Sequence, residues 1–364
     1  MTERPASILI VRLGAIGDIV FASALIPVLR QAFPDARLVW LADEAYKDLL
    51  IHNPRLDRVA TWPRARWAKL RKEGHYGVLL KEFRVLVRSL REERFDWVLD
   101  LQGLMKSGIW AALAGGKTRI GLGSREGSQF LMTKRIDRRT ESNAIGNDYL
   151  KLAVELGLDT EAFAMDFVPG AEAETEAGTI LEALGIEGPY VAIFPFTTRP
   201  QKHWIDGNWS AMADEISTRY GWPVVMLGGP DDTERAAGIQ RRCGSGLKNL
   251  AGKTGLAISG ALIRRSALGI GVDTGLTHMS IALGRPTLAL FGSTAPYLET
   301  GREDAMVLYE ALPCSPCERR PTCAGAFTCM AQLTVEKTLT AVDALLKRNW
   351  LVKPAPVPSA ARVS

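Results

Sequence analysis

The chain has 364 residues, of which 47% are apolar, and a formal net charge of +5. This length exceeds what one hydrophobic core usually supports, so we expect two domains of roughly 150 to 200 residues. No stretch of 18 apolar residues is present, and the opening residues MTERPASILIV contain no cleavable apolar segment. The composition therefore argues against a membrane span and a secretory signal, and predicts a cytoplasmic protein.

The first half predicts an α/β domain over residues 1–170. Apolar runs that predict strands alternate with a glycine loop at 14–18 and a helix over 19–33. Val/Ile/Leu-rich strands of this kind are typical of doubly wound parallel sheets covered by helices on both faces. The strands are expected at 7–13, 37–42, 96–103 and 119–123.

The second half repeats this plan and predicts a further domain over residues 189–350. A longer loop at 197–208 leads into a helix over 209–220, and a last helix is expected over 334–350 with Thr334 as its N-cap. Residues 171–188 are acidic and bounded by Pro and Gly, which predicts a linker with one short helix. The tail, 351–364, is expected to be disordered. The strands are expected at 189–196, 223–229, 268–275 and 286–293.

Basic residues concentrate in the first half. Residues 60–94 contain ten Lys or Arg and four Glu, an excess of +6, and residues 117–139 add seven basic residues against two acidic ones. A solvated helix face, a nucleic acid, an anionic membrane or an acidic substrate could each explain the excess. No element that reads a DNA groove is apparent, whereas Trp62 and Trp67 in this tract suit a membrane interface.

The loop G-A-I-G-D at residues 14–18 places a carboxylate, Asp18, between a strand and a helix. It lacks the G-x-G-x-x-G spacing of dinucleotide-binding loops, and a carboxylate repels the anion that such a loop holds. The sequence therefore does not favour a dehydrogenase.

Two segments of the second half predict a diphosphate site at the carboxyl edge of its sheet. One strand ends at Asp273, and a helix begins at Thr274 and Gly275, so that backbone N–H groups can face an anion; His278 follows one turn later. A capped helix start with a buried, hydrogen-bonded histidine remains the alternative.

The loop after residue 196 supplies the other groups. Thr197 and Thr198 offer hydroxyls and Lys202 offers a charge suited to phosphate, although Lys202 could be an ordinary loop lysine. After the next strand, Asp232, or less favourably Glu234, is placed to hold a ribose.

Several other chemistries lack their motifs. GGKT at 115–118 and AGKT at 251–254 miss the first glycine of a phosphate loop, and neither G-x-S-x-G nor H-E-x-x-H is present. Four cysteines lie in CSPCERRPTCAGAFTC, where the C-x2-C pair is compatible with a metal and the second pair fits no standard zinc spacing. Metal binding and reduced thiols both stay open for Cys314, Cys317, Cys323 and Cys329.

Four segments in order resemble glycosyltransferase family 9, the bacterial lipopolysaccharide heptosyltransferases. They are LIVRLGAIGDIVFASALIPVLRQAFPDA, FDWVLDLQGLMKSG, TTRPQKHWIDGNW and GVDTGLTHMSIALG. The form T-T-R-x-x-K-H-W and the tract RARWAKLRK favour the type I subgroup, which transfers heptose from ADP-heptose to the Kdo (3-deoxy-octulosonate) sugar of lipid A. The cysteine cluster is not part of that pattern.

The resemblance implies a GT-B fold, two Rossmann-like domains facing across a cleft, and an inverting transfer that needs no metal or other cofactor. Asp18 would be the general base, and the loop glycines would leave space for a sugar. Lys202, Thr197, Thr198 and the amides of Thr274 and Gly275 would bind the ADP diphosphate, with Asp232 at the ribose and Asp273 and His278 at the heptose and phosphate end. Candidates for the anionic groups of the acceptor are Arg64, Arg66, Lys69, Lys106 and Arg125.

These implications have competitors. Type II and type III heptosyltransferases act on a heptose-bearing core, and a non-catalytic, nucleotide-dependent binding protein at the membrane surface would share the fold. The presence of both Asp18 and Lys202 argues against the non-catalytic reading. We expect an enzyme that works peripherally on the cytoplasmic face of the inner membrane and binds no nucleic acid.

Overall fold

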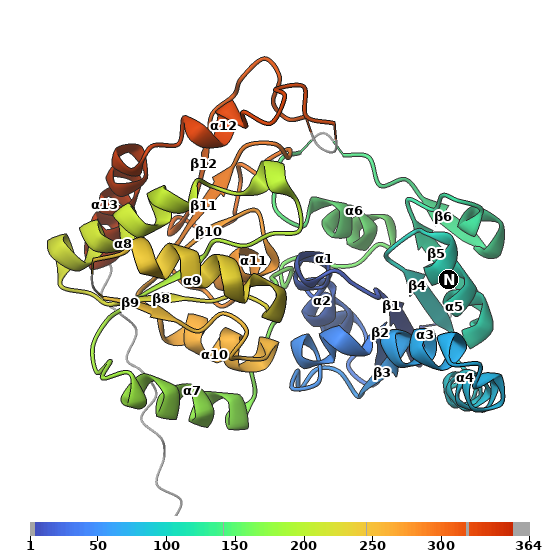
Figure 1. The fold of residues 1–364 in the computed structure, drawn as a ribbon. Coiled ribbons are helices and arrows are strands. Elements are labelled where there is room, and N and C mark those ends of the chain that lie inside the picture. Colours follow the sequence, from blue (N-terminus) through green and yellow to red (C-terminus); the bar gives the residue numbers. More distant parts are fainter. Residues whose placement is uncertain (1–3, 141, 245, 318–319, 352–364) are drawn as a thin grey trace, which may run out of the picture. The chain divides into compact units, whose positions relative to one another are not determined.

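The computed structural model describes residues 4–140, 142–244, 246–317 and 320–351. Its internal contacts divide the chain into two compact units. Unit 1 comprises Met1–Gly185, Thr254–Arg265 and Thr274–Leu283, and unit 2 comprises Ile186–Lys253, Ser266–Asp273 and Gly284–Ser364. Each unit contains one six-stranded sheet (Figure 1).

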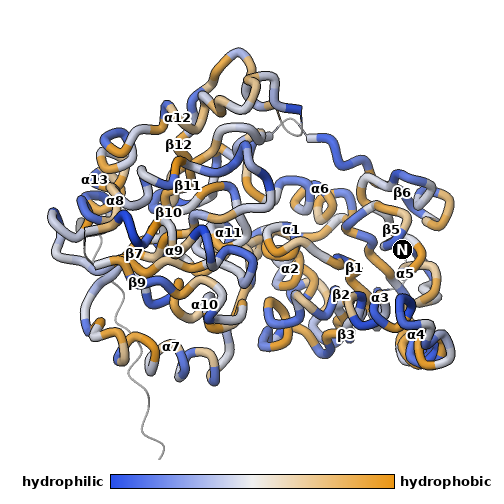
Figure 2. The backbone as a smooth tube through the Cα atoms, viewed as in Figure 1, coloured by the Kyte–Doolittle hydropathy of each residue, from blue (hydrophilic) through white to orange (hydrophobic). Residues whose placement is uncertain are grey.

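The sheet of unit 1 is parallel throughout and has the strand order β3-β2-β1-β4-β5-β6. Its central strands are buried on both faces, as the continuous apolar runs predict, and they appear in apolar colours in Figure 2. The strands are β1 (Ser7–Val11), β2 (Arg37–Asp43), β3 (Arg58–Trp62), β4 (Trp97–Asp100), β5 (Thr118–Leu122) and β6 (Lys134–Ile136).

One prediction about the helices of unit 1 is wrong. The single helix expected over 19–33 is two helices, α1 (Ile16–Ala22) and α2 (Leu25–Ala32). Pro27 lacks an N–H, and its ring excludes a continuous helix across residue 23, so the chain turns there. The other helices of the unit are α3 (Arg64–Lys72), α4 (Tyr76–Arg91), α5 (Met105–Ala114), α6 (Asn147–Glu155), α7 (Ala171–Ala183), α10 (Leu256–Arg265) and α11 (Gly275–Ala282), with 3-10 turns η1 (Glu44–Leu49) and η2 (Ser128–Leu131).

An aromatic cluster within unit 1 packs helices α3 and α4 against α5 and β3. Trp67 is only 9% exposed, and its ring centroid lies 6.0 Å from Phe83 and 6.1 Å from Trp110. Trp62 lies 5.9 Å from the same Trp110 ring. The expectation that Trp67 faces a membrane interface is therefore wrong, because packing against Trp62, Phe83 and Trp110 already removes its ring from water. Trp62 is half-buried.

The sheet of unit 2 is likewise parallel, with the order β12-β11-β10-β7-β8-β9. Its strands are β7 (Val191–Phe194), β8 (Val224–Met226), β9 (Leu247–Asn249), β10 (Leu268–Val272), β11 (Thr287–Phe291) and β12 (Ala305–Tyr309). The helices are α8 (Asp206–Tyr220), α9 (Thr233–Arg242), α12 (Thr328–Ala331) and α13 (Val335–Leu351), with 3-10 turns η3 (Pro200–Lys202) and η4 (Pro230–Asp232).

The core of unit 2 joins its helices to the sheet. Trp204 and Trp209 are fully buried and meet edge to face, and Trp204 Nε1 donates to the carbonyl oxygen of Leu333 at 2.6 Å. Thr334 caps α13, because its Oγ1 accepts from the N–H of Lys337 at 3.2 Å, as predicted. The tail predicted to be disordered lies, from residue 352 on, outside the described residues.

In each sheet the order of the strands reverses at one point, and ligands of open α/β sheets bind at such points, beyond the carboxyl ends of the strands. In unit 1 the reversal lies between β1 and β4, and in unit 2 between β7 and β10. Within the described part of the chain, no helix is both long and apolar enough to cross a membrane.

Candidate active site

In unit 1, the reversal point is organised by a buried arginine. Arg12 follows β1 and is 5% exposed; its Nη1 donates to the carbonyl oxygen of Leu101, just after β4, at 3.2 Å. Its own carbonyl oxygen accepts from Trp40 Nε1 at 3.2 Å. Leu13 N donates to Gln102 Oε1 at 3.2 Å. These bonds fix the loop after β1 against the loop after β4.

Asp18 occupies the third position of α1, at this edge. Its Oδ2 lies 2.5 Å from Arg12 Nη2 and accepts from the N–H of Ala15 at 3.3 Å. The Asp18 side chain is 48% exposed, whereas that of Arg12 is 6% exposed. The structure thus holds a carboxylate by one oxygen on a rigid cation and leaves it open to solvent. A base positioned in this way can accept a proton from a hydroxyl group.

Side chains of the protein pack so closely against Gly14 and Gly17 that neither position has room for a Cβ atom. A Cβ added to Gly14 would lie 2.5 Å from Tyr46 Cε2, and one added to Gly17 would lie 2.5 Å from His278 Cδ2. The expectation that these glycines leave space for a sugar is wrong, since Tyr46 and His278 fill that space. His278 is 5% exposed, and its ring centroid lies 4.5 Å from that of Phe21.

A second buried carboxylate at this edge was not predicted. Asp100 ends β4 with no exposed surface, and its Oδ1 accepts from the N–H groups of Gln102 and Gly103, both at 3.1 Å. Burial raises the pKa of Asp100, while these N–H groups and the nearby Arg12 lower it. The signal in the sequence is DLQG, an aspartate before a tight glycine turn. The expected strand at 96–103 and the segment that resembles family 9 both contain it, but neither singles out Asp100.

In unit 2, the reversal point carries an ion pair that joins the ends of β7 and β10. Lys202 Nζ lies 2.5 Å from Asp273 Oδ2, and the two side chains are only 17% and 14% exposed. Thr294 Oγ1 donates to the same carboxylate oxygen at 2.6 Å, and Thr197 Oγ1 donates to the carbonyl oxygen of Asp273 at 3.3 Å. The structure therefore brings together Thr197, Lys202 and Asp273, three residues singled out from the sequence.

Thr294 and Tyr297 were missed. Both follow β11, and burial, with a smaller contribution from Asp273, raises the pKa of Tyr297 well above its usual value. The phenol ring packs edge to face on Phe291 at 5.1 Å. Only their position after the strand expected at 286–293 could have indicated them.

The remaining residues predicted to bind the donor have local contacts of their own. Thr198 is exposed, and Asp232 closes its own turn, because its Oδ2 accepts from the N–H of Gly229 at 2.8 Å. Glu234 is exposed in the first turn of α9. Thr274 is the N-cap of α11 with extended backbone, and Gly275 lies against Ile16, where an added Cβ would be 2.4 Å from Ile16 Cγ2. By its contacts α11 belongs to unit 1.

The five predicted acceptor residues divide into two groups. Three are paired with carboxylates of unit 1: Arg64 with Asp43 at 2.5 Å, Arg66 with Glu82 at 2.7 Å and Lys69 with Glu73 at 3.9 Å. Lys106 and Arg125 are exposed and have no carboxylate partner among the described residues. The N–H of Arg125 donates to the carbonyl oxygen of Gly103 at 2.9 Å, which ties its turn to the loop after β4.

The cysteine cluster is a set of free thiols with different exposure. Cys314 is exposed, Cys317 and Cys323 are half-buried, and Cys329 is buried. Burial raises the pKa of Cys329, and the other three thiols raise it further. Among the residues that the structure describes, which exclude 318 and 319, no three His, Cys, Asp or Glu side chains are arranged to hold a metal ion.

Comparison with known proteins identifies the family. The model of glycosyltransferase family 9 (heptosyltransferase) matches residues 83–327. The chain belongs to glycosyltransferase family 9. Lipopolysaccharide heptosyltransferase 1 of Pseudomonas aeruginosa is 29% identical over 90% of this chain and 89% of the relative. Lipopolysaccharide heptosyltransferase 3 of Escherichia coli K12 is 26% identical over 76% of this chain and 80% of the relative.

Solved structures show the same architecture. A family 9 glycosyltransferase from Veillonella parvula superposes with a TM-score of 0.79 at 20% identity, over 94% of this chain and 97% of the other. The E. coli heptosyltransferase WaaC with ADP-2-deoxy-2-fluoro heptose gives 0.70 at 23% identity, over 94% and 99%. The predicted α/β fold of the GT-B type is thus confirmed. The family match and the curated relative confirm the prediction of a heptosyl-transferring glycosyltransferase.

Proposed function

We propose that this family 9 enzyme transfers heptose from ADP-heptose to the Kdo sugar of the lipid A inner core. The relative with 29% identity carries the name of a type I enzyme, and the form T-T-R-x-x-K-H-W at residues 197–204 favours the same subgroup. Type II and type III action on a heptose-bearing core is the competing proposal, since a type III enzyme matches 76% of the chain. The observation that carries the proposal is the exposed Asp18 carboxylate on buried Arg12.

In the proposed reaction, Asp18 removes the proton of the attacking acceptor hydroxyl. The hydroxyl oxygen forms a bond to the anomeric carbon of heptose as the bond from that carbon to the phosphate oxygen breaks, so ADP leaves with the electron pair. A single displacement of this kind inverts the anomeric centre and requires no metal in its proton transfer. Arg12 would hold Asp18 on the acceptor side throughout.

Lys202 is the proposed partner of the leaving diphosphate. Its ammonium lies 2.5 Å from Asp273 Oδ2, so a bound phosphate would share or replace that contact. A hydrogen bond between two charged groups is stronger than one between neutral groups, which would stabilise charge developing on ADP. Thr197, Thr198 and the amides of Thr274 and Gly275 are the further proposed ligands of the diphosphate.

The roles of the other predicted site residues are proposed from their positions in the fold. Asp232 would hold the ribose, and Asp273 and His278 would lie at the heptose end. Lys106 and Arg125, exposed beside the loop after β4, are the better candidates for anionic groups of the acceptor, whereas Arg64, Arg66 and Lys69 would first have to leave their carboxylates. The acceptor is a lipid, so we place the enzyme at the cytoplasmic face of the inner membrane.

The deciding experiment offers the purified chain ADP-heptose together with Kdo-lipid A or, separately, heptosylated core, and weighs the products by mass spectrometry. One added heptose on Kdo-lipid A alone is the expected result. Transfer only to heptosylated core would replace type I by type II or III. Binding of ADP without any transfer would favour the non-catalytic binding protein.

A further inference from the structure

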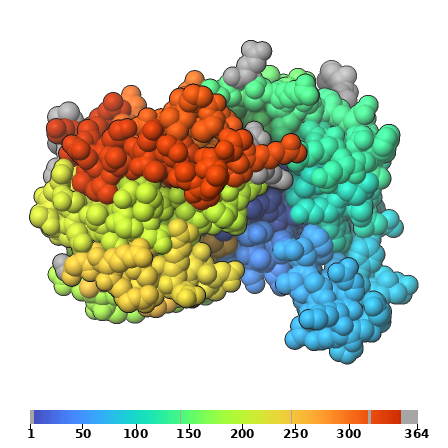
Figure 3. Space-filling view, turned by 45° about the horizontal axis from the view of Figure 1, so that its top comes forward, coloured from blue at the N-terminus to red at the C-terminus, as the bar shows by residue number. Residues whose placement is uncertain are grey.

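Helix α4 carries a stripe of cations on its solvent side. Lys81, Arg84, Arg88 and Arg91 follow one another at spacings of three, four and three residues, which places them on one face of the helix, and all four are exposed. Arg94, three residues beyond Arg91, is also exposed. We call these five residues the α4 stripe. In Figure 3 the light-blue segment that contains α3 and α4 projects from the body of unit 1.

Most of this charge is not neutralised within the protein. Lys81, Arg84, Arg91 and Arg94 have no carboxylate partner among the described residues. Arg88 pairs with Glu92 at 2.8 Å, but both side chains stay largely exposed, at 82% and 62%. Such a pair contributes little to stability and is readily exchanged. On the neighbouring helix α3, by contrast, Arg64 and Arg66 are bound to Asp43 and Glu82.

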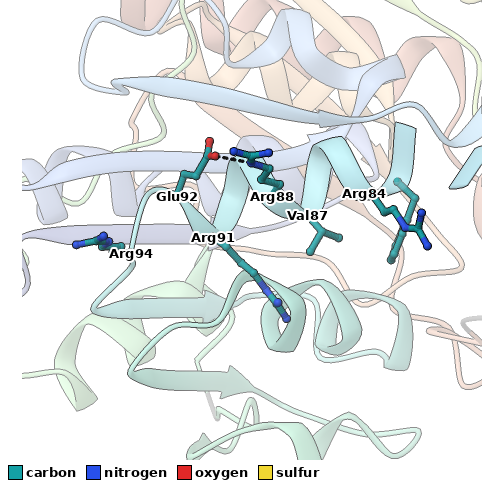
Figure 4. A pocket seen from close by; sticks show the side chains of 7 residues that line it. Arg84, Val87, Arg88, Arg91, Glu92 and Arg94 are labelled. Carbon is teal, nitrogen blue, oxygen red and sulfur yellow. Dashed lines mark hydrogen bonds and ion pairs between the residues drawn. The ribbon is translucent and has the colours of Figure 1, made fainter. Parts of the chain in front are cut away.

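The stripe also lines a cavity and is flanked by apolar groups. Arg84, Arg88, Arg91 and Arg94 surround a cavity of about 550 Å³ against α4 (Figure 4), and Val87 lies at its wall. Beyond the cavity, α4 exposes four apolar or aromatic side chains, with exposed fractions of 43 to 62%: Tyr76, Val78, Leu80 and Val85. Arg91 is itself fixed, since its Nε donates to the carbonyl oxygen of Leu113 at 2.9 Å.

We propose that the α4 stripe docks the enzyme on the surface of a bilayer rich in anionic phospholipid. Unpaired guanidinium groups complement lipid phosphates, and exposed valine, leucine and tyrosine beside them can enter the interface, which is the pattern of an interfacial helix. A nucleic acid would use the cations but not the apolar residues. The proposal deepens the proposed function, because it names the surface that brings the enzyme to a lipid-borne acceptor, but vesicle binding can be measured without any transfer.

The test is sedimentation of the full chain with vesicles of phosphatidylethanolamine and phosphatidylglycerol, and with vesicles of phosphatidylcholine alone. We expect binding to the anionic vesicles only, and binding that weakens with salt. The variant K81Q/R84Q/R88Q should lose about 100-fold in partitioning, because each basic residue near an anionic surface contributes about fivefold. The separate variant Val85→Asp should also weaken binding, and should do so at high salt as well.

The matched control is R241Q/R242Q/K347Q, which removes the same charge from exposed positions of unit 2. It should bind vesicles within about twofold of the wild-type chain, and circular dichroism should show equal melting for all variants. The proposal is overturned if wild type does not bind anionic vesicles, if K81Q/R84Q/R88Q binds as wild type does, or if both triple variants lose binding equally. It is also overturned if a DNA duplex displaces the vesicles from wild type at equal phosphate concentration.

Failure of this proposal and failure of the proposed function remain distinguishable. With an acceptor freed of its acyl chains, transfer by K81Q/R84Q/R88Q should equal that of wild type, and its affinity for ADP should be unchanged. If the wild-type chain binds the vesicles but transfers no heptose, the proposed function alone is overturned.

Discussion

At the scale of single residues, the pair of Arg12 and Asp18 concentrates the chemistry of unit 1. Arg12 is bound to the backbone of the neighbouring loop and to Trp40, so it cannot follow Asp18 if that side chain moves. The carboxylate therefore has one preferred position, with one face towards solvent. This arrangement fits a proton acceptor, because Arg12 fixes the carboxylate while its open side can be reached by a hydroxyl group.

Replacing Asp18 with Asn tests that role. The amide keeps the size and a hydrogen-bond acceptor for Arg12 but cannot take a proton, so kcat should fall by roughly 10²- to 10⁴-fold. Affinity for ADP, measured by calorimetry, should change little. Asp35→Asn, in the exposed turn before β2, serves as the control and should keep full activity. A D18N enzyme that retains more than about a third of the wild-type rate would rule out Asp18 as the base.

For the second pair, Lys202 and Asp273, the two single substitutions should change ADP affinity in opposite directions. Lys202→Ala removes a charged contact to phosphate and should weaken ADP binding by about 1.5 to 3 kcal/mol, along with turnover. Asp273→Asn removes the carboxylate that competes for Lys202, so ADP should bind at least as tightly as to wild type while transfer falls. Calorimetry with ADP measures both, and Lys347→Ala on α13 is the control. Unchanged ADP affinity in K202A would remove Lys202 from the donor site.

At the scale of elements, Glu93 joins the end of α4 to two strands of the first sheet. Its carboxylate accepts from Arg37 Nε of β2 at 2.5 Å and from Arg58 Nη1 of the edge strand β3 at 2.9 Å. The hydrogen bond with Arg37, followed by that with Arg58, holds the pKa of Glu93 below its usual value, although burial acts in the opposite direction. The Glu93 side chain is 11% exposed, whereas those of Arg37 and Arg58 are 48% and 33% exposed.

The lowered pKa predicts how stability depends on pH. A carboxyl group whose pKa is lower in the folded than in the unfolded chain stabilises the fold above the unfolded pKa of about 4.3, and that contribution is lost as pH falls through the folded pKa. Glu93→Gln should therefore lower the free energy of unfolding by about 1 to 3 kcal/mol at pH 7. Urea unfolding should show the difference from wild type shrinking below about pH 4.

The exposed neighbour provides the comparison for Glu93. Glu92→Gln breaks only the surface pair with Arg88 and should change the free energy of unfolding by less than about 0.5 kcal/mol at any pH. Equal effects of E92Q and E93Q would contradict the role given to Glu93.

The helices and strands also show which elements can be predicted from the sequence. Strands buried on both faces, such as β1 and β10, were predicted from short apolar runs bounded by loop residues. The four edge strands, β3, β6, β9 and β12, were missed. β3, β6 and β9 are short and contain polar residues, and β12 has an apolar run, AMVLY, that is only partly buried. The break between α1 and α2 could have been predicted from Pro27.

The same limit applies to the candidate site. Asp18, Lys202 and Asp273 were singled out by their positions after apolar runs and by the resemblance to family 9. Their partners were not: Thr294 lies 21 residues from Asp273, and nothing local marks it as a donor to that carboxylate. Nor does the sequence reveal that Arg64 and Arg66 are neutralised while Arg84 is not, because each pairing depends on which carboxylate the fold brings within reach.

At the scale of the whole molecule, the chain does not pass once from one unit to the other. Residues 254–265 and 274–283 pack with unit 1, although they are flanked in sequence by strands of unit 2. Helix α10 ends at Arg265, which with Arg264 forms ion pairs with Glu174 of α7 at 3.1 and 2.7 Å, and β10 begins three residues later. Helix α11 begins three residues after β10 ends. The spacers are too short for β10 to unfold without pulling on both helices.

This connectivity predicts one cooperative thermal transition for the full chain, seen by calorimetry as equal calorimetric and van't Hoff enthalpies. It further predicts that a fragment of residues 1–185 does not fold stably by itself. The fragment would lack α10 and α11, leave Glu174 without its two arginines and expose Phe167, which lies so close to Gly260 that an added Cβ there would be 2.4 Å from Phe167 Cε1. Two separate transitions in the full chain, or a fragment 1–185 that melts cooperatively at the temperature of the intact protein, would show that the two units are energetically independent despite the five points at which the chain passes between them.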